Sequence, residues 1–174
     1  MKHAWIASLL LLGVSPLANA APPVSTPAPA TACSITVDVT DEDPKGVNVR
    51  ATPGGKIIAT LVDSADWIEL HVTAQTGDWY EIDKATQIDN DGGDAVLWHG
   101  KGYVHKSVVG LSGLQQGTTI YTDHDLKSRA LATNADGDQK TDLLGCWKDF
   151  YKIHIKQGTG WTKEVCTNEN TTCS

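Results

Sequence analysis

The feature that most constrains the fold of this chain is an internal repeat. The segment Asp-Trp-Tyr-Glu-Ile at 78–82 returns as Asp-Phe-Tyr-Lys-Ile at 149–153. Downstream, Gly-Lys-Gly-Tyr-Val at 100–104 is matched by Gly-Thr-Gly-Trp-Thr at 158–162. Each copy therefore contains a short strand with alternating faces, a turn and a Gly-x-Gly-aromatic segment. Self-similarity of this kind predicts two copies of one small structural unit.

Further strands are expected upstream of both motifs, in the same order. Segments 57–61 and 129–133 occupy matching places, and they are followed by 67–72 and 141–146. A unit of about five short strands has to curl its sheet to bury one face, as small barrels do. We therefore expect an all-β protein built from two tandem small β-barrels.

The N-terminus has the pattern of an export signal. Lys2 and His3 precede an apolar run at 6–14, and Ala-Asn-Ala at 18–20 offers a small-x-small cleavage site. The run is shorter than the stretch of about 20 apolar residues that spans a bilayer. We expect residues 1–20 to be a signal peptide cleaved after Ala20. The mature protein is then periplasmic or secreted, with no insertion into the membrane.

Residues 21–32 are rich in proline, which predicts a flexible linker. Cys33 follows Ala-Thr-Ala, so a lipid anchor is an alternative, but the apolar run ends well before this cysteine. Beyond the linker we expect one domain at 33–112 and a second at 113–174.

The chain carries 14 basic and 21 acidic residues. This acidic balance offers no electrostatic footprint for nucleic acid or for an anionic membrane surface.

The even number of cysteines predicts two disulfides in an oxidising compartment. The four are Cys33, Cys146, Cys166 and Cys173, and they allow three connectivities. Cys146 with Cys166 would join two parts of the second unit, and Cys33 with Cys173 would tie the chain ends. The local pair of Cys166 with Cys173 is equally allowed. A zinc site is the alternative, but no close Cys-x-x-Cys pair is present, so we expect neither metal nor cofactor.

Three motifs in order resemble the bacterial SH3 (SH3b) domain family. Gly-Val-Asn-Val-Arg-Ala-Thr-Pro-Gly at 46–54 is similar to the opening segment of that family. The segment 78–82 resembles its Gly-x-Trp-x-x-Val strand, and 102–104 its Gly-Trp-Val ending. The likeness covers residues 33–110, and the second unit, about 115–174, shares it through its aromatic strand and Gly-Trp. The resemblance implies that both barrels are SH3-like.

The resemblance also implies a role, namely recognition of a cell-wall peptide, peptidoglycan or an envelope protein through an aromatic groove. Tyr80, Tyr103 and Tyr151 are the best groove candidates, because a phenol offers an apolar face while its hydroxyl stays wet. Trp79 and Trp161 are expected to cap the barrels or to add to the groove.

The first copy carries an insertion within about 84–99, and it contains Asp-Asn-Asp-Gly-Gly-Asp at 89–94. Calcium binding is one interpretation, but the spacing lacks the glycine and the closing glutamate of an EF-hand. A hairpin turn fits better. Polar turns are likewise expected at 123–125 (Asp-His-Asp) and at 134–138 (Asn-Ala-Asp-Gly-Asp).

No catalytic motif stands out in the chain. Cys146 precedes Trp147 as a peptidase nucleophile can precede an aromatic residue, but it ends a predicted strand and has three potential disulfide partners. The histidines at 71, 99, 105, 124 and 154 are scattered, and no serine elbow, zinc-binding helix or phosphate loop is present. We predict a non-enzymatic binding protein. The alternatives are a periplasmic inhibitor, immunity or accessory protein, and a cell-wall hydrolase.

Overall fold

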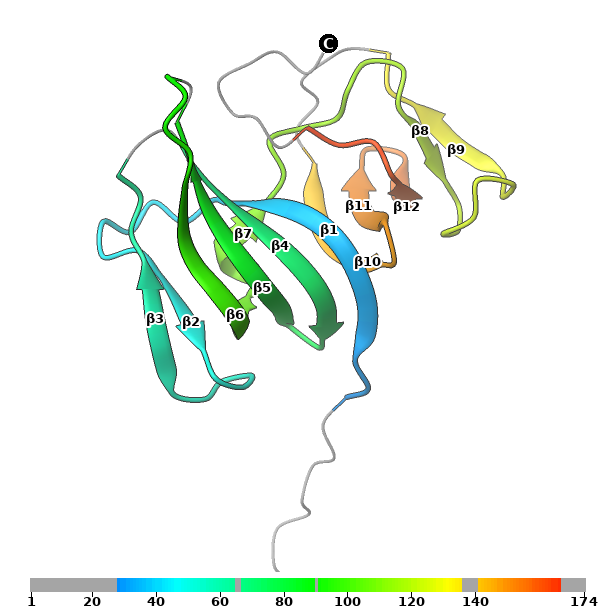
Figure 1. Ribbon diagram of the computed structural model, residues 1–174. Helices are drawn as coiled ribbons and strands as arrows, with labels where there is room; N and C mark the ends of the chain where they lie inside the picture. The colour runs from blue at the N-terminus through cyan, green and yellow to red at the C-terminus, as the bar shows by residue number, and fades with distance from the viewer. Residues whose placement is uncertain (1–27, 65–66, 90, 136–140, 167–174) are drawn as a thin grey trace, which may run out of the picture.

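Strands make up most of the computed structural model of this protein, which describes residues 28–64, 67–89, 91–135 and 141–166 (Figure 1). These residues contain twelve strands and one short 3₁₀ turn, η1 (Lys106–Val108). The strands form a curled seven-stranded sheet and a five-stranded sheet beside it. The predicted all-β class is confirmed. The expected signal peptide lies outside the described residues.

The first sheet has the strand order β3-β2-β6-β5-β4-β1-β7. Its members are β1 (Thr31–Val39), β2 (Val47–Arg50), β3 (Ile57–Leu61), β4 (Trp67–Thr76), β5 (Trp79–Ile88), β6 (Ala95–His105) and β7 (Val109–Gly110). The second sheet has the order β10-β11-β12-β8-β9. Its members are β8 (Thr119–Tyr121), β9 (Ala130–Thr133), β10 (Asp142–Trp147), β11 (Phe150–Ile155) and β12 (Gly158–Thr162).

The internal repeat is visible in the strand order. The run β3-β2-β6-β5-β4 in the first sheet corresponds to β9-β8-β12-β11-β10 in the second. The register agrees as well, because Ile82 lies opposite Gly102 and Ile153 lies opposite Gly160. Both isoleucines are fully buried. The two halves therefore share one arrangement of five strands, to which the first half adds β1 and β7.

The two repeated glycines are required by the close approach of a neighbouring strand. A Cβ on Gly102 would lie 2.3 Å from Cγ1 of Val49, and a Cβ on Gly160 would lie 2.4 Å from Cγ2 of Ile120. Val49 and Ile120 occupy matching places on β2 and β8, whose next residues pair with Tyr103 and Trp161. The Gly-x-Gly-aromatic motif thus marks the place where β2 packs closely against β6 in the first unit, and β8 against β12 in the second.

The insertion within 84–99 lengthens the hairpin between β5 and β6. Lys84 pairs with His99, and Gln87 pairs with Ala95. The lengthened part of β5 also pairs with β4, where Trp67 lies opposite Ile88. The insertion is therefore continuous sheet that ends in a turn, as the sequence predicted for 89–94.

β1 is a strand that the sequence pattern does not predict, and it begins inside the proline-rich segment expected to be a linker. β1 pairs with β4 and β7, and it also contacts the second sheet. The N–H of Ser34 donates to the carbonyl of Lys148 (2.6 Å), and the N–H of Lys148 donates to the carbonyl of Ala32 (2.8 Å). β1 is therefore the strand that joins the two repeats.

One disulfide crosses this junction, between Cys33 on β1 and Cys146 on β10. The two pairings considered across the second unit and between the chain ends, Cys146–Cys166 and Cys33–Cys173, are therefore wrong. Cys166 is disulfide-bonded too. Its possible local partner Cys173 lies outside the described residues. The physical reason for the error is that no local pattern around Cys33 indicates that β1 reaches the second sheet.

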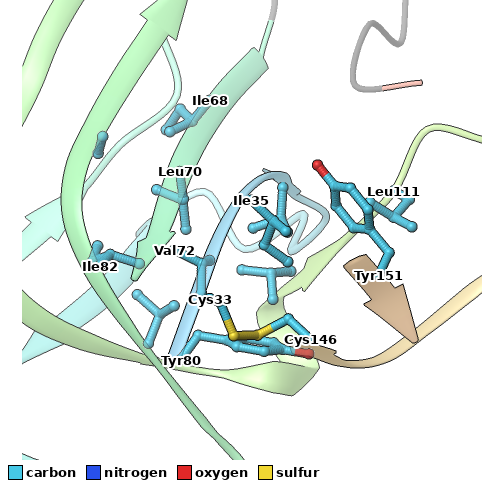
Figure 2. Close-up of a cluster of buried hydrophobic side chains, with 14 of the residues drawn as sticks. Cys33, Ile35, Ile68, Leu70, Val72, Tyr80, Ile82, Leu111, Cys146 and Tyr151 are labelled. Atoms are coloured by element: carbon cyan, nitrogen blue, oxygen red, sulfur yellow. A yellow bond between two sulfur atoms is a disulfide. The ribbon is translucent and has the colours of Figure 1, made fainter. Parts of the chain in front are cut away.

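A single hydrophobic cluster runs through both repeats. It includes Ile35 and Tyr80 from the first sheet and Ile120 and Ile153 from the second. Figure 2 shows the disulfide within this cluster, together with Tyr80 and Tyr151. The two units consequently share buried surface.

The junction disulfide should contribute strongly to stability, because it closes a loop with a sequence separation of 113. Replacing both Cys33 and Cys146 by serine is expected to lower the free energy of unfolding by about 2–5 kcal/mol, since a long closed loop restricts the unfolded chain most. Urea unfolding followed by circular dichroism measures this change. Equal midpoints for the double variant and the parent protein would contradict the structural importance of the bond.

Candidate functional site

The structure does not bring the five predicted ligand residues together, because two of the tyrosines belong to the core. Tyr80 is fully buried, and Tyr151 is 7% exposed. The hydroxyl of Tyr151 donates to the carbonyl of Thr36 (3.0 Å) and accepts from its N–H (3.2 Å). Burial raises the pKa of both phenols, that of Tyr151 to about 12. Neither ring can offer a face to a ligand.

Trp79 and Tyr103 do lie on the outer face of the first sheet, half-buried among charged neighbours. The guanidinium of Arg50 lies 5.9 Å from the Trp79 ring, whose centroid is 5.1 Å from that of His105. The hydroxyl of Tyr103 donates to Oε2 of Glu81 (2.8 Å), which also pairs with Lys101 at 2.8 Å. Partial burial disfavours the charged form, but the hydrogen bonds from Lys101 and Tyr103 leave the pKa of Glu81 below its ordinary value. The polar groups of this surface thus bind one another.

The matching surface of the second repeat differs in its chemistry. Lys152 pairs across the strands with Trp161, as Glu81 pairs with Tyr103, and Gly145 lies opposite Lys152 on β10. The Lys152 ammonium lies 5.5 Å from the centroid of the Trp161 ring. A hydrogen-bonded pair that contains a carboxylate is thus replaced by a lysine beside a tryptophan. The space next to Gly145 is filled by Gln75 from the first sheet, since a Cβ on Gly145 would lie 2.6 Å from Oε1 of Gln75.

A groove of about 330 Å³ opens at this surface. Its walls are aromatic, because the His124 ring lies 4.0 Å from Trp147 and 5.2 Å from Trp161 between ring centroids. Thr31 and Gln75 reach it from the first sheet. Among the described residues, the lining consists of Thr31, Gln75, His124, Leu144, Gly145, Cys146, Trp147, Lys152 and Trp161. This groove, built by both repeats and by the disulfide, is the candidate functional site.

His124 reaches the groove from the turn that joins β8 and β9. Thr122 and Arg129 close this turn by a backbone hydrogen bond of 2.9 Å. Within it, Oδ1 of Asp123 accepts the N–H of His124 (2.8 Å) and lies 2.6 Å from its Nδ1. The polar turn predicted at 123–125 is therefore confirmed, and it holds the imidazole against the two tryptophans.

Trp147 is positioned by a tight turn between β10 and β11. Lys148 adopts a φ of +51°, and it is the single non-glycine residue with a positive φ among the described residues. Its ammonium lies 4.2 Å from the Trp147 ring. The same turn makes the backbone contact with β1, so one local structure fixes both the junction and a wall of the groove.

Sequence reasoning found Trp161 but missed Trp147 and His124 as members of one site. In the sequence, Trp147 stands out only beside Cys146, and His124 only within a polar turn. The repeat itself carried a usable signal. At the position of Trp147 the first copy has Thr76, which lies opposite Trp79 as Trp147 lies opposite Phe150. An aromatic residue gained in one copy alone is a reason to suspect a binding surface there.

A hydrogen-bonded line of three side chains also lies on the open face of the first sheet. Oγ of Ser34 lies 3.3 Å from Nε2 of His71, and Nδ1 of His71 lies 2.6 Å from Oδ1 of Asp83. Ser34 and Asp83 both fall at register shifts of their strands. The sequence analysis did not foresee this group, because its members come from three strands.

No cluster of three or more histidine, cysteine or acidic side chains that could hold a metal ion occurs in the described residues. The acidic turn at 89–94 is closed from within. The carboxylates of Asp89 and Asp94 accept backbone N–H groups of Asp91 and Asp89, respectively. Residues 136–138 of the second acidic segment lie outside the described part of the chain.

Comparisons with known proteins give no family assignment, since no protein-family model, curated protein or solved structure matches the chain. In the part of the chain that the structure describes, no helix has the length and apolar character needed to cross a bilayer.

The two buried tyrosines should make the protein sensitive to alkali. The unfolded chain ionises near the ordinary phenol pKa of 10.0, whereas burial keeps both phenols neutral in the folded state. The free energy of unfolding should therefore fall as the pH rises from about 10 towards 12. Urea titrations at pH 7 to 11 measure this fall, which Tyr80→Phe and Tyr151→Phe should each reduce.

The same two variants should differ at pH 7. Tyr80→Phe should leave stability unchanged or raise it, because its buried hydroxyl has no hydrogen-bond partner among the residues that the structure describes. Tyr151→Phe should cost about 1 kcal/mol, the usual contribution of a lost hydrogen bond. Strong destabilisation by Tyr80→Phe would contradict the placement of its ring.

Proposed function

We propose that this chain is an exported, non-catalytic binding protein of the bacterial cell envelope, formed by two SH3-like units. It recognises peptidoglycan, its peptides or an envelope protein, and it uses the groove of the second repeat. The observation that carries the proposal is the convergence of His124, Trp147 and Trp161 around a groove of about 330 Å³. Concave sites with aromatic walls and a few polar groups are typical of small-ligand and peptide recognition.

Several features support an SH3-like description of the units. The motifs that resemble the SH3b family fall on β2, β5 and β6, and their equivalents fall on β8, β11 and β12. The second unit has five antiparallel strands. A junction disulfide is compatible with export to an oxidising compartment.

The test is sedimentation of the mature protein with purified peptidoglycan sacculi. Trp161→Ala should reduce the bound fraction at least about fivefold, since removal of a central aromatic anchor commonly costs 1 kcal/mol or more. Trp79→Ala is the matched control, because Trp79 is a half-buried tryptophan on the outer face of the other repeat. It should leave binding unchanged. Circular dichroism of both variants verifies that they fold.

Two results would contradict the proposal that the groove binds peptidoglycan. Sacculi that fail to retain the parent protein at low salt would remove peptidoglycan as the target. Equal losses for Trp161→Ala and Trp79→Ala would place binding outside the groove. Recovery of one stoichiometric protein from periplasmic extract, lost with Trp161→Ala, would instead identify an envelope protein as the partner.

A specific observation favours the cell-wall hydrolase as a second candidate. Ser34, His71 and Asp83 have the order and hydrogen-bond reach of a serine nucleophile, its base and an orienting carboxylate. The backbone N–H of Ser34 is engaged by the carbonyl of Lys148, so it does not serve an oxyanion. This engagement makes binding the stronger candidate.

A fluorophosphonate probe decides between the two. The non-catalytic proposal expects no labelling of the folded protein, since an open sheet face offers no stabilisation of the transition state. Labelling that disappears in Ser34→Ala and in His71→Ala would establish the hydrolase instead. Mass spectrometry of the intact protein, with Ser107→Ala as a matched control, provides the measurement.

A further inference from the structure

The groove has a positive character in an acidic protein. The whole chain has a formal net charge of −7. None of the described residues that line the groove carries a carboxylate, whereas Lys152 belongs to the lining. The carboxylate next to the groove, that of Asp123, pairs with His124 at 2.6 Å. Lys148 lies beside the groove, over the Trp147 ring. Among the described residues, the ion pairs found involve neither Lys148 nor Lys152.

The comparison of the two repeats shows that this charge is specific to the second. Glu81 in the first repeat is satisfied by Lys101 and Tyr103. Among the described residues, the contact found for the Lys152 ammonium at the matching position is with the Trp161 ring, 5.5 Å from its centroid. An exposed contact between a cation and an aromatic ring is worth about 0.5–1 kcal/mol. The ammonium can therefore turn to a ligand anion at little cost.

The side chain of Gln75, which lines the groove, already makes hydrogen bonds within the protein. The side-chain carbonyl of Gln75 accepts the N–H of Cys146 (3.2 Å), and its amide donates to the carbonyl of Gly77 (3.1 Å). Recognition of a sugar needs many hydrogen bonds to hydroxyl groups, and the lining leaves few side chains for them. The walls instead suit a ligand with an apolar body and one anionic group.

We infer that the groove binds the C-terminal carboxylate of a short peptide, with Lys152 as the partner of the carboxylate and Trp147 and Trp161 against the apolar side chains. This inference rests on the proposed function, because it names the ligand class of the same groove. A charge-assisted hydrogen bond from lysine to carboxylate supplies the specificity.

The experiment uses the mature full chain and two probes, N-acetyl-alanyl-alanine as the free acid and as the C-terminal amide. Titrations followed by the NMR signals of the tryptophan indole N–H groups should show shifts at Trp147 and Trp161. The free acid should bind about tenfold more tightly than the amide, a ratio typical of one charge-assisted contact. Lys152→Gln should remove that ratio. Lys156→Gln, which changes an exposed lysine in the turn after β11, should preserve it.

Each other outcome overturns the inference. Equal affinity for acid and amide, or an unchanged ratio in Lys152→Gln, would exclude the carboxylate contact. Tighter binding of N-acetylglucosamine or of inorganic phosphate would assign the groove to a sugar or to a simple anion. If sacculus binding still depends on Trp161 in these cases, the proposed function stands and only the ligand class fails. If sacculus binding does not depend on Trp161, the proposed function itself fails.

Discussion

The contact between β1 and the turn after β10 is the interaction on which the rest of the structure depends. Two backbone hydrogen bonds join Ser34 and Ala32 to Lys148, and the disulfide from Cys33 to Cys146 lies beside them. β1 is at the same time an internal strand of the first sheet, between β4 and β7. A displacement of β1 would therefore disturb the first sheet, the shared core and the groove together.

The groove is a consequence of this junction. Cys146 and Trp147 lie at the end of β10, where the contact with β1 fixes them, and Thr31 and Gln75 approach from the first sheet. An isolated second repeat would keep His124 and Trp161 but would lose one side of the site. Duplication thus supplied two similar surfaces, and the packing of the two copies made one of them concave. The other surface satisfies its own charges through Glu81, Lys101 and Tyr103.

The errors of the sequence-based site have a common physical cause. Tyr80 and Tyr151 were predicted to line a groove because a phenol tolerates water. Both instead lie on the buried face of their strands, where they alternate with residues that point outward. Alternation alone separates the two faces of a strand, but it does not say which face meets the core. His124 and Trp147 escaped notice because 23 positions separate them in the chain, from 124 to 147, and only the folding of β8 against β12 brings their rings together.

Local pattern and spacing are enough to predict the all-β class, the internal repeat and the Gly-x-Gly-aromatic motif that both copies share. The turn residues at 89–94 also predict the hairpin that lengthens the first repeat. Only the tertiary structure decided that the two repeats share a core, that Cys33 pairs with Cys146, and that one aromatic surface forms a groove. These features depend on contacts between residues distant in the chain, which no local pattern encodes.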